Sequence, residues 1–156
     1  IILTVAVPSF SGFIRNSQMA TQANSLVTGL NLARSEAIKR NARVSICTSA
    51  NGTSCASSTN WATGWLIFVD EAGTIGVLDS TDELLKVQEA LEGSATLTSS
   101  SSSGVTFVST GYKSDYDDSS PSTITFTLDH SSCTGDQKRT ITITPFGRIE
   151  LVRESC

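Results

Sequence analysis

The only histidine of the chain lies between two residues that could complete a hydrolytic triad with it. The segment Asp129-His130-Ser131 contains an acid, a general base and a hydroxyl nucleophile. A triad needs these groups to converge from different parts of a fold, whereas neighbours on a strand point to opposite faces. GxSxG, P-loop and HExxH motifs are absent from the sequence. We therefore expect no enzymatic activity and no cofactor.

Two groups of acidic residues could in principle bind calcium, which needs several converging oxygen ligands. The first group flanks a Gly-containing turn without the spacing of an EF-hand, and the second falls within a single loop; they are Asp70, Glu71 and Asp79, and Asp115, Asp117 and Asp118. Acidic residues in turns are usually solvated. We interpret both groups in this way and expect no bound metal.

The four cysteines have neither the CxxC spacing nor the additional histidines of a zinc site. Three disulfide pairings are possible, and we favour Cys47 with Cys55 and Cys133 with Cys156. Free buried thiols or another connectivity are the alternatives. Disulfides would place the chain in an oxidising compartment, such as the periplasm or the cell surface, and so predict an exported protein.

Charge is distributed unevenly along the 156 residues, which have a net charge of −4. Residues 1–43 contain five basic residues and one acidic residue (+4), whereas residues 44–156 contain six basic and fourteen acidic residues (−8). One domain is expected from this length. An acidic chain is a poor general nucleic-acid binder unless its basic residues gather in one place.

These side chains must be positioned by a long helix followed by a β-rich region. Apolar residues recur at helical spacing from Met19 to Ala37, and basic residues at positions 39 and 40 suit a helix C-terminus. This pattern therefore predicts that residues 1–41 form one helix of about 60 Å, kinked or loosened near Pro8. We expect residues 1–20 to project from the domain, residues 21–41 to pack on the head, and residues 42–156 to form that head.

The N-terminal residues 1–14 are strongly apolar and uncharged. As a helix they would be about 21 Å long, which is short for a hydrocarbon core of about 30 Å. We expect this segment to pack into lipid or against other copies, although a buried core helix is the alternative. The candidate assembly residues are Ile1, Ile2, Leu3, Val5, Val7, Pro8, Phe10, Phe13 and Ile14.

After residue 41 the pattern changes to short strands joined by polar turns. The predicted strands cover residues 43–47, 64–70, 84–91, 105–108, 122–128, 139–144 and 148–152, whereas residues 98–103 and 113–121 predict exposed loops. Five aromatic residues are expected in the core or on a sheet face: Trp61, Trp65, Phe68, Phe107 and Phe126. An α+β fold, with antiparallel sheets beside one long helix, follows from this order.

Several motifs along the whole chain resemble those of the GspH/FimT family of type IV minor pilins and type II secretion minor pseudopilins. The similar segments are Ala33-Arg34-Ser35-Glu36-Ala37-Ile38-Lys39-Arg40-Asn41, Gly64-Trp65-Leu66-Ile67-Phe68-Val69-Asp70, Val105-Thr106-Phe107 with Gly111, and Thr144-Pro145-Phe146-Gly147-Arg148. The resemblance implies the type IV pilin fold. Mature pilins begin with an N-methylated Phe and have Glu at the fifth position; neither is present here, so we expect the sequence to start beyond the processing site.

The resemblance implies a structural function. We expect a minor pilin that is held in the inner membrane by its helix, with the head in the periplasm of a Gram-negative bacterium. It would then join a type IV pilus near the tip, contact other minor and major pilins, and help to prime assembly. A minor pseudopilin of a type II secretion system is an alternative.

DNA binding is a second alternative, because some FimT-type pilins bind DNA near a C-terminal Gly-Arg motif. The candidate contacts are Lys138, Arg139, Arg148 and Arg153. Glu150 and Glu154 lie among them, and Glu150 would share a strand face with Arg148. We therefore expect at most weak attraction for phosphate.

Overall fold

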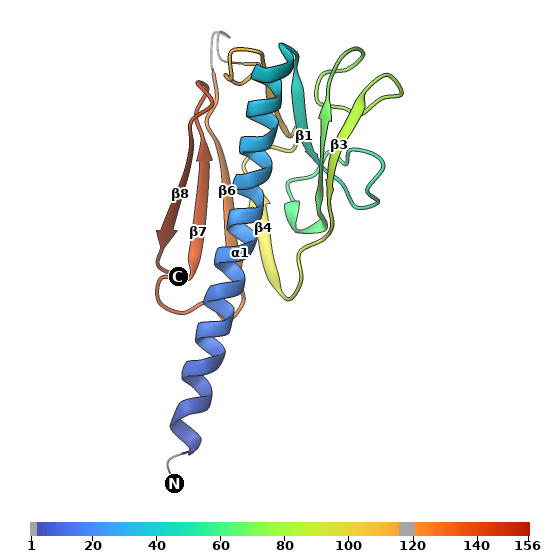
Figure 1. Cartoon of the computed structure of the whole chain (residues 1–156). Helices are drawn as coiled ribbons and strands as arrows, with labels where there is room; N and C mark the ends of the chain where they lie inside the picture. The colour runs from blue at the N-terminus through green and yellow to red at the C-terminus, as the bar shows by residue number, and fades with distance from the viewer. Residues whose placement is uncertain (1–2, 116–120) are drawn as a thin grey trace.

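The computed structural model describes residues 3–115 and 121–156, which form a long helix and two four-stranded sheets (Figure 1). The helix α1 spans Leu3–Arg40. It is followed by β1 (Val44–Thr48), the 3₁₀ helix η1 (Trp61–Thr63), β2 (Trp65–Val69), β3 (Glu83–Gln88), β4 (Ala95–Ser99), β5 (Val105–Phe107), β6 (Ile124–His130), β7 (Lys138–Ile143) and β8 (Ile149–Glu154). The predicted α+β class is confirmed.

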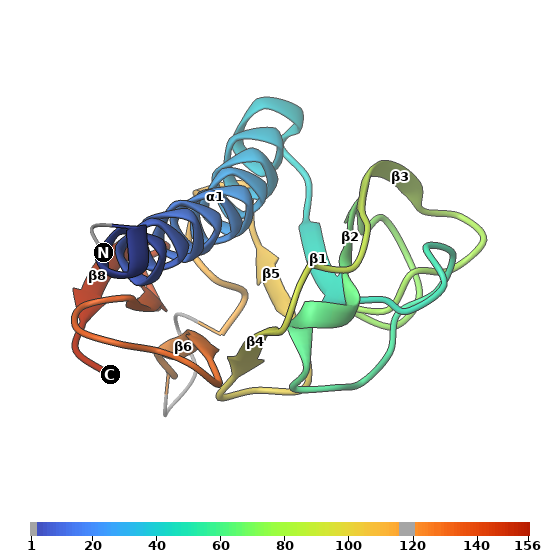
Figure 2. The same cartoon turned by 90° about the horizontal axis from the view of Figure 1, so that it is seen from below.

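All strand pairs are antiparallel. We call the sheet with the order β3-β2-β1-β5 sheet A, and the sheet with the order β4-β6-β7-β8 sheet B. Helix α1 lies on one side of both sheets and extends beyond them towards the N-terminus (Figures 1 and 2). The N-terminal part of the helix is therefore separated from the sheets.

Helix α1 packs on the sheets through the stripe of residues that its periodicity predicts. At most 1% of the surface is exposed for each residue of this stripe, which consists of Met19, Ala23, Leu26, Leu30, Ala33 and Ala37. Gly29 lies on the same side, where an added Cβ would be 3.1 Å from Nε1 of Trp65. Glycine in a helix costs roughly 1 kcal/mol relative to alanine, and here it permits the helix to approach β2 closely.

Aromatic side chains fill the seam between the two sheets. Trp61 of η1 contacts Phe126 of β6 edge to face, with ring centroids 4.9 Å apart, and lies 6.2 Å from Trp65 of β2. In β6 and β7 the inward residues alternate with outward ones, which is the two-residue period of a strand with one buried face. Sheet B therefore buries one face against the helix and sheet A.

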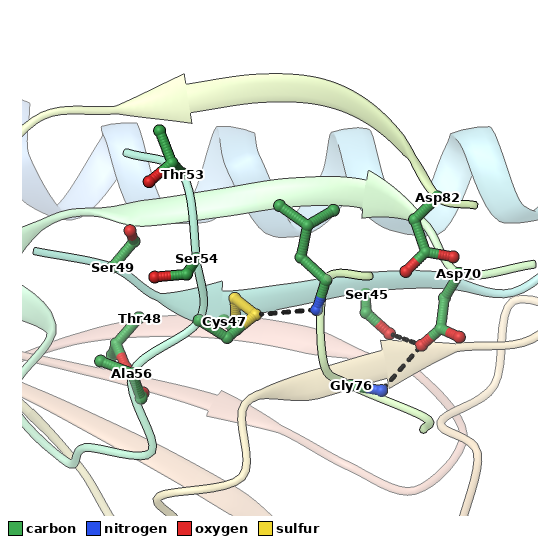
Figure 3. Close-up of a disulfide and its surroundings, with 12 residues drawn as sticks. Ser45, Cys47, Thr48, Ser49, Thr53, Ser54, Ala56, Asp70, Gly76 and Asp82 are labelled. Atoms are coloured by element: carbon green, nitrogen blue, oxygen red, sulfur yellow. Dashed lines mark hydrogen bonds between the residues drawn. A yellow bond between two sulfur atoms is a disulfide. The ribbon is translucent and has the colours of Figure 1, made fainter. Parts of the chain in front are cut away.

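The outer face of sheet A is covered by loops instead of a helix. Cys47, Leu66 and Phe68 are buried there with Cys55 and Leu78 packed against them. The Cys47–Cys55 disulfide holds one loop, and the buried carboxylate of Asp70 accepts 2.7 Å hydrogen bonds from the Ser45 hydroxyl and the Gly76 amide (Figure 3). Both faces of β1 and β2 are consequently buried.

Two local predictions differ from the structure. Strand β4 was not predicted, because its Thr and Ser residues run into the Ser-rich segment 98–103; Leu97 and Ser99 are nevertheless buried, and β4 pairs with β6 along its length. The third predicted strand ends at Gln88, where the chain turns towards the helix. As predicted, one long helix covers this region: α1 is continuous through Pro8, since a proline removes only a single i→i−4 hydrogen bond.

Candidate assembly surface

The projecting part of α1 exposes large apolar side chains. The exposed fractions of Phe10 and Phe13 are 67% and 71%, and that of Ile14 is 42%. The alternative of a buried core helix is wrong for these three residues. Leu3, Val5, Val7 and Pro8 belong to the first turns of the same helix, whereas Ile1 and Ile2 lie outside the described residues.

The turn between β6 and β7 holds α1 at the point where the helix leaves the head. Arg15 donates from Nη1 to the Ser132 carbonyl at 2.7 Å, and Gln137 donates from Nε2 to the Gly12 carbonyl at 3.4 Å. Arg139 donates from Nη2 to Oδ1 of Asn16 at 2.7 Å. We call these three contacts the helix clamp. They reach back to Gly12, so the segment without head contacts is shorter than the expected residues 1–20.

Arg139 also organises the turn itself. Its Nη1 donates to the carbonyls of Asp136, Gln137 and Lys138, at 3.0, 2.6 and 3.1 Å. Burial lowers the pKa of the Arg139 guanidinium, and the nearby charge of Arg153 lowers it further. Only 4% of Arg139 is exposed, so it is wrong as a candidate DNA contact.

The second disulfide closes the same region. Cys133 lies in the turn and is bonded to Cys156, and the Cys156 amide donates to the Gly135 carbonyl at 2.9 Å. Both disulfides have the pairing that the sequence analysis favoured. The C-terminus is thereby attached to the turn that makes the helix clamp.

The outward face of α1 continues from the apolar segment along the head as a row of small, uncharged residues. All members are exposed and repeat at alternating intervals of three and four: Ser17, Thr21, Asn24, Thr28, Asn31 and Ser35. The two charged residues between Phe10 and Ser35 both turn towards the head, since Arg15 bonds Ser132 and Arg34 donates from Nε to the Gly111 carbonyl at 2.9 Å. The alternating spacing of these uncharged residues is the signal in the sequence that indicates this face.

The other candidate basic residues are close to acids or to backbone carbonyls. Lys138 lies 3.8 Å from Glu154, and Arg148 lies 3.8 Å from Glu150. Arg153 donates to the Asp136 carbonyl, at 3.3 Å from Nε and 3.2 Å from Nη2. The structure therefore does not assemble these four residues into one exposed basic cluster.

The candidate catalytic segment does not form a triad. The ring of His130 accepts a hydrogen bond at Nδ1 from the Ser132 amide and contacts Oγ of Ser94 through Nε2, at 3.0 and 2.7 Å. The Asp129 carboxylate instead accepts from the His130 backbone amide at 2.7 Å. His130 thus serves to position the turn.

The acidic groups do not converge either. Asp70 is occupied by Ser45 and Gly76, and Asp79 accepts from the amide and the hydroxyl of Thr81. Asp117 and Asp118 lie outside the described residues. Across residues 3–115 and 121–156, no three histidine, cysteine or acidic side chains are grouped so as to hold a metal ion.

The arrangement of a projecting helix on a two-sheet head matches known proteins. The sequence model of the family described as type II transport protein GspH matches residues 22–147. The chain belongs to this family. The GspH/FimT-like resemblance predicted from the sequence is thus confirmed. No curated protein matches the chain significantly.

Solved structures of a minor pilin and a minor pseudopilin have the same fold. The type IV minor pilin FimU of Pseudomonas aeruginosa PAO1 has a TM-score of 0.67 and 22% identity, over 92% of this chain and 98% of FimU. The minor pseudopilin EpsH of the Vibrio cholerae type II secretion system has a TM-score of 0.55 and 13% identity, over 87% of this chain and 97% of EpsH. The type IV pilin fold is therefore established for this GspH-family chain.

Proposed function

We propose that the chain is a structural minor pilin of a type IV pilus, incorporated near the tip, where it helps to prime assembly. The observation that carries this proposal is the exposure of Phe10 and Phe13 on a helix that extends beyond the head. Monomeric proteins rarely leave such side chains together in water. The projecting helix requires an apolar environment, and neighbouring pilin helices provide one.

The gain from burying this segment is substantial. Complete burial of one large apolar side chain contributes about 1.5–3 kcal/mol, before the cost of association. Phe10, Phe13 and Ile14 together would stabilise a helix–helix contact by several times that amount. The uncharged outward face from Ser17 to Ser35 allows a neighbouring helix to continue along the head without burying an unpaired charge.

Before assembly, the same segment would hold the protein in the inner membrane of a Gram-negative bacterium with its head in the periplasm, and the assembled protein would reach the cell surface. The two disulfides support an oxidising compartment. No helix within the described residues is both long and apolar enough to cross a membrane.

A minor pseudopilin of a type II secretion system is the second candidate, and the description of the matching family favours it. DNA binding has less support, because Arg139 is buried and Lys138 and Arg148 lie beside acids. To distinguish the first two functions, the chain is expressed in strains that lack it. Restored pilus formation supports the minor pilin, and restored protein secretion supports the minor pseudopilin.

Substitution of Phe10→Ser together with Phe13→Ser in the full chain tests the assembly helix. The double variant should be recovered from sheared filaments at least about tenfold less than the unchanged chain, because two apolar contacts are lost. Ile75→Ser is the matched control, since Ile75 is 53% exposed on a head loop. Incorporation of the double variant at the unchanged level would contradict the proposal, and so would an equal loss with the control.

A further inference from the structure

The loop after β1 contains the only Asn-Gly pair of the sequence, Asn51-Gly52. The Cys47–Cys55 disulfide closes this loop, and we call residues 49–54 the Asn51 loop (Figure 3). Asparagine before glycine is prone to cyclise, because glycine has no side chain to hinder attack of its amide nitrogen on the asparagine Cγ. The attack requires a polarised side-chain carbonyl and an acceptor for the proton of the attacking nitrogen. The contacts around Asn51 supply both.

Two backbone amides point at the side-chain carbonyl of Asn51. The amides of Thr53 and Ser54 donate to its Oδ1 at 2.9 and 3.0 Å. These two donors also identify the atom as the oxygen of the carboxamide, since the nitrogen could not accept from them. Paired backbone amides at one carbonyl oxygen are the arrangement that stabilises an oxyanion as it develops. Fixed dipoles therefore polarise the carbon that is attacked.

The Ser49 hydroxyl connects the attacking nitrogen to the carbonyl. The Gly52 amide donates to Oγ of Ser49 at 3.0 Å, and Ser49 Oγ donates to Oδ1 of Asn51 at 3.2 Å. One hydroxyl can thus accept the proton that the nitrogen must lose and give a proton to the oxygen that becomes negative. Ser49 is only 3% exposed, and its own amide donates to the Gly64 carbonyl at 3.0 Å. The end of β1 therefore fixes its position.

The leaving group and the solvent are also placed for the reaction. Asn51 donates from Nδ2 to Oγ of Ser54 at 2.9 Å. Asn51 is exposed and, together with Gly52, lines a cavity of about 340 Å³ beside the end of β3. Water therefore has access to the ring that cyclisation forms, and ammonia has a way out.

We infer that Asn51 is a site of spontaneous modification, at which the folded loop promotes cyclisation and deamidation. The Gly52 nitrogen forms a bond to Cγ of Asn51, and its proton passes through Ser49 to Oδ1. The tetrahedral intermediate then re-forms the carbonyl, transfers this proton to Nδ2 and breaks the Cγ–Nδ2 bond, which releases ammonia and leaves a succinimide. Water adds to either ring carbonyl and gives aspartate or isoaspartate at position 51, so no oxidant, reductant or enzyme is needed.

The product changes the loop in one of two ways. A carboxylate at position 51 adds one negative charge to a chain whose net charge is −4. It also accepts the hydrogen bonds from the Thr53 and Ser54 amides more strongly than a carboxamide does. Isoaspartate in addition lengthens the backbone by a methylene group inside the loop that the Cys47–Cys55 disulfide closes. The inference is independent of the proposed function, which concerns other residues.

Incubation of the full chain in detergent micelles at neutral pH tests the inference. Peptide mass spectrometry measures the products at position 51, and digestion in ¹⁸O-labelled water marks any deamidation that occurs during digestion itself. The native chain should deamidate at Asn51 at least about tenfold faster than the same chain reduced and unfolded in guanidinium chloride, because unfolding removes the amide pair and the relay. A succinimide at position 51 should precede aspartate and isoaspartate.

Matched variants identify the groups responsible. Ser49→Ala should slow deamidation of the native chain at least about tenfold, because the proton relay is lost. The same variant should leave the rate in the unfolded chain unchanged, since the Asn-Gly pair is retained. Ser57→Ala, which removes an exposed hydroxyl outside these contacts, is the control and should leave the native rate unchanged. The unfolding midpoint of each variant verifies that it is folded.

Three results would overturn the inference: a native rate at or below the unfolded rate, an unchanged or faster native rate in Ser49→Ala, or aspartate formed without succinimide and isoaspartate. The first would show that the hydrogen bonds protect Asn51 instead of activating it. The proposed function is tested separately, because Phe10→Ser with Phe13→Ser alters incorporation into filaments and leaves the Asn51 loop unchanged.

Discussion

Nη2 of Arg139, on β7, lies 2.7 Å from Oδ1 of Asn16, on α1, across 123 positions of sequence. This hydrogen bond joins the start of β7, in sheet B, to the point where α1 leaves the head. The same guanidinium donates to three carbonyls of the β6–β7 turn. A single buried side chain therefore sets both the shape of the turn and the exit of the assembly helix.

Removal of this contact should destabilise the head. We expect Asn16→Ala to lower the free energy of unfolding by about 1–2 kcal/mol, and Arg139→Ala by about 3–5 kcal/mol, because the second change also leaves turn carbonyls without donors. Urea unfolding of the full chain measures both. A double-mutant cycle should give a coupling of about 1–2 kcal/mol. Additive effects would show that the Asn16 contact contributes nothing.

The C-terminal disulfide should contribute through the unfolded chain and through the last strand. Cys133→Ser with Cys156→Ser opens a loop with a sequence separation of 23, which should cost about 2–4 kcal/mol. Strand β8 is an edge strand, so its amide hydrogens should exchange faster in the variant. Unchanged stability together with unchanged exchange in β8 would contradict this prediction.

Acid should weaken the contact around Lys113. Burial by itself raises the pKa of Asp115, but the hydrogen bonds from Ser122 and Lys113 outweigh it, so the pKa is lowered overall. A lowered carboxyl pKa gives stability that is present above the ordinary aspartate value of about 4 and is lost as the pH falls through the folded-state pKa.

Asp115→Asn should remove this part of the pH dependence. We expect a loss of about 1 kcal/mol at neutral pH, and a smaller difference between the variant and the unchanged chain at low pH. Unfolding midpoints measured across the acid range provide the check. A constant difference at every pH would show that ionisation of Asp115 is not involved.

The full chain in detergent should not shift duplex DNA in a mobility assay at about 150 mM salt, since phosphate contacts weaken steeply with salt. Glu150→Gln with Glu154→Gln should increase any binding seen at low salt, because these acids lie beside Arg148 and Lys138. A clear shift at physiological salt that is lost in Arg148→Ala with Arg153→Ala would instead establish DNA binding.

Local patterns in the sequence were sufficient to predict most of the architecture. The helical repeat from Met19 to Ala37 predicts both the helix and its packed face, and the segments between polar turns predict strands β6 and β7. These features depend on the 3.6- and two-residue periods of side-chain direction, which neighbouring positions specify. The apolar run at the N-terminus likewise predicts the exposed helix segment.

The tertiary structure decided what periodicity does not encode. Strand β4 has the composition of a loop, yet pairing with β6 satisfies its backbone and buries Leu97. Arg139 has the residue type of a surface contact, but the β6–β7 turn and Asn16 supply acceptors for its guanidinium and make burial favourable. The hydrogen bond from Gln22 to the Glu92 carbonyl joins residues 70 positions apart. Such contacts arise only when distant segments converge, so their chemistry follows from the assembled fold.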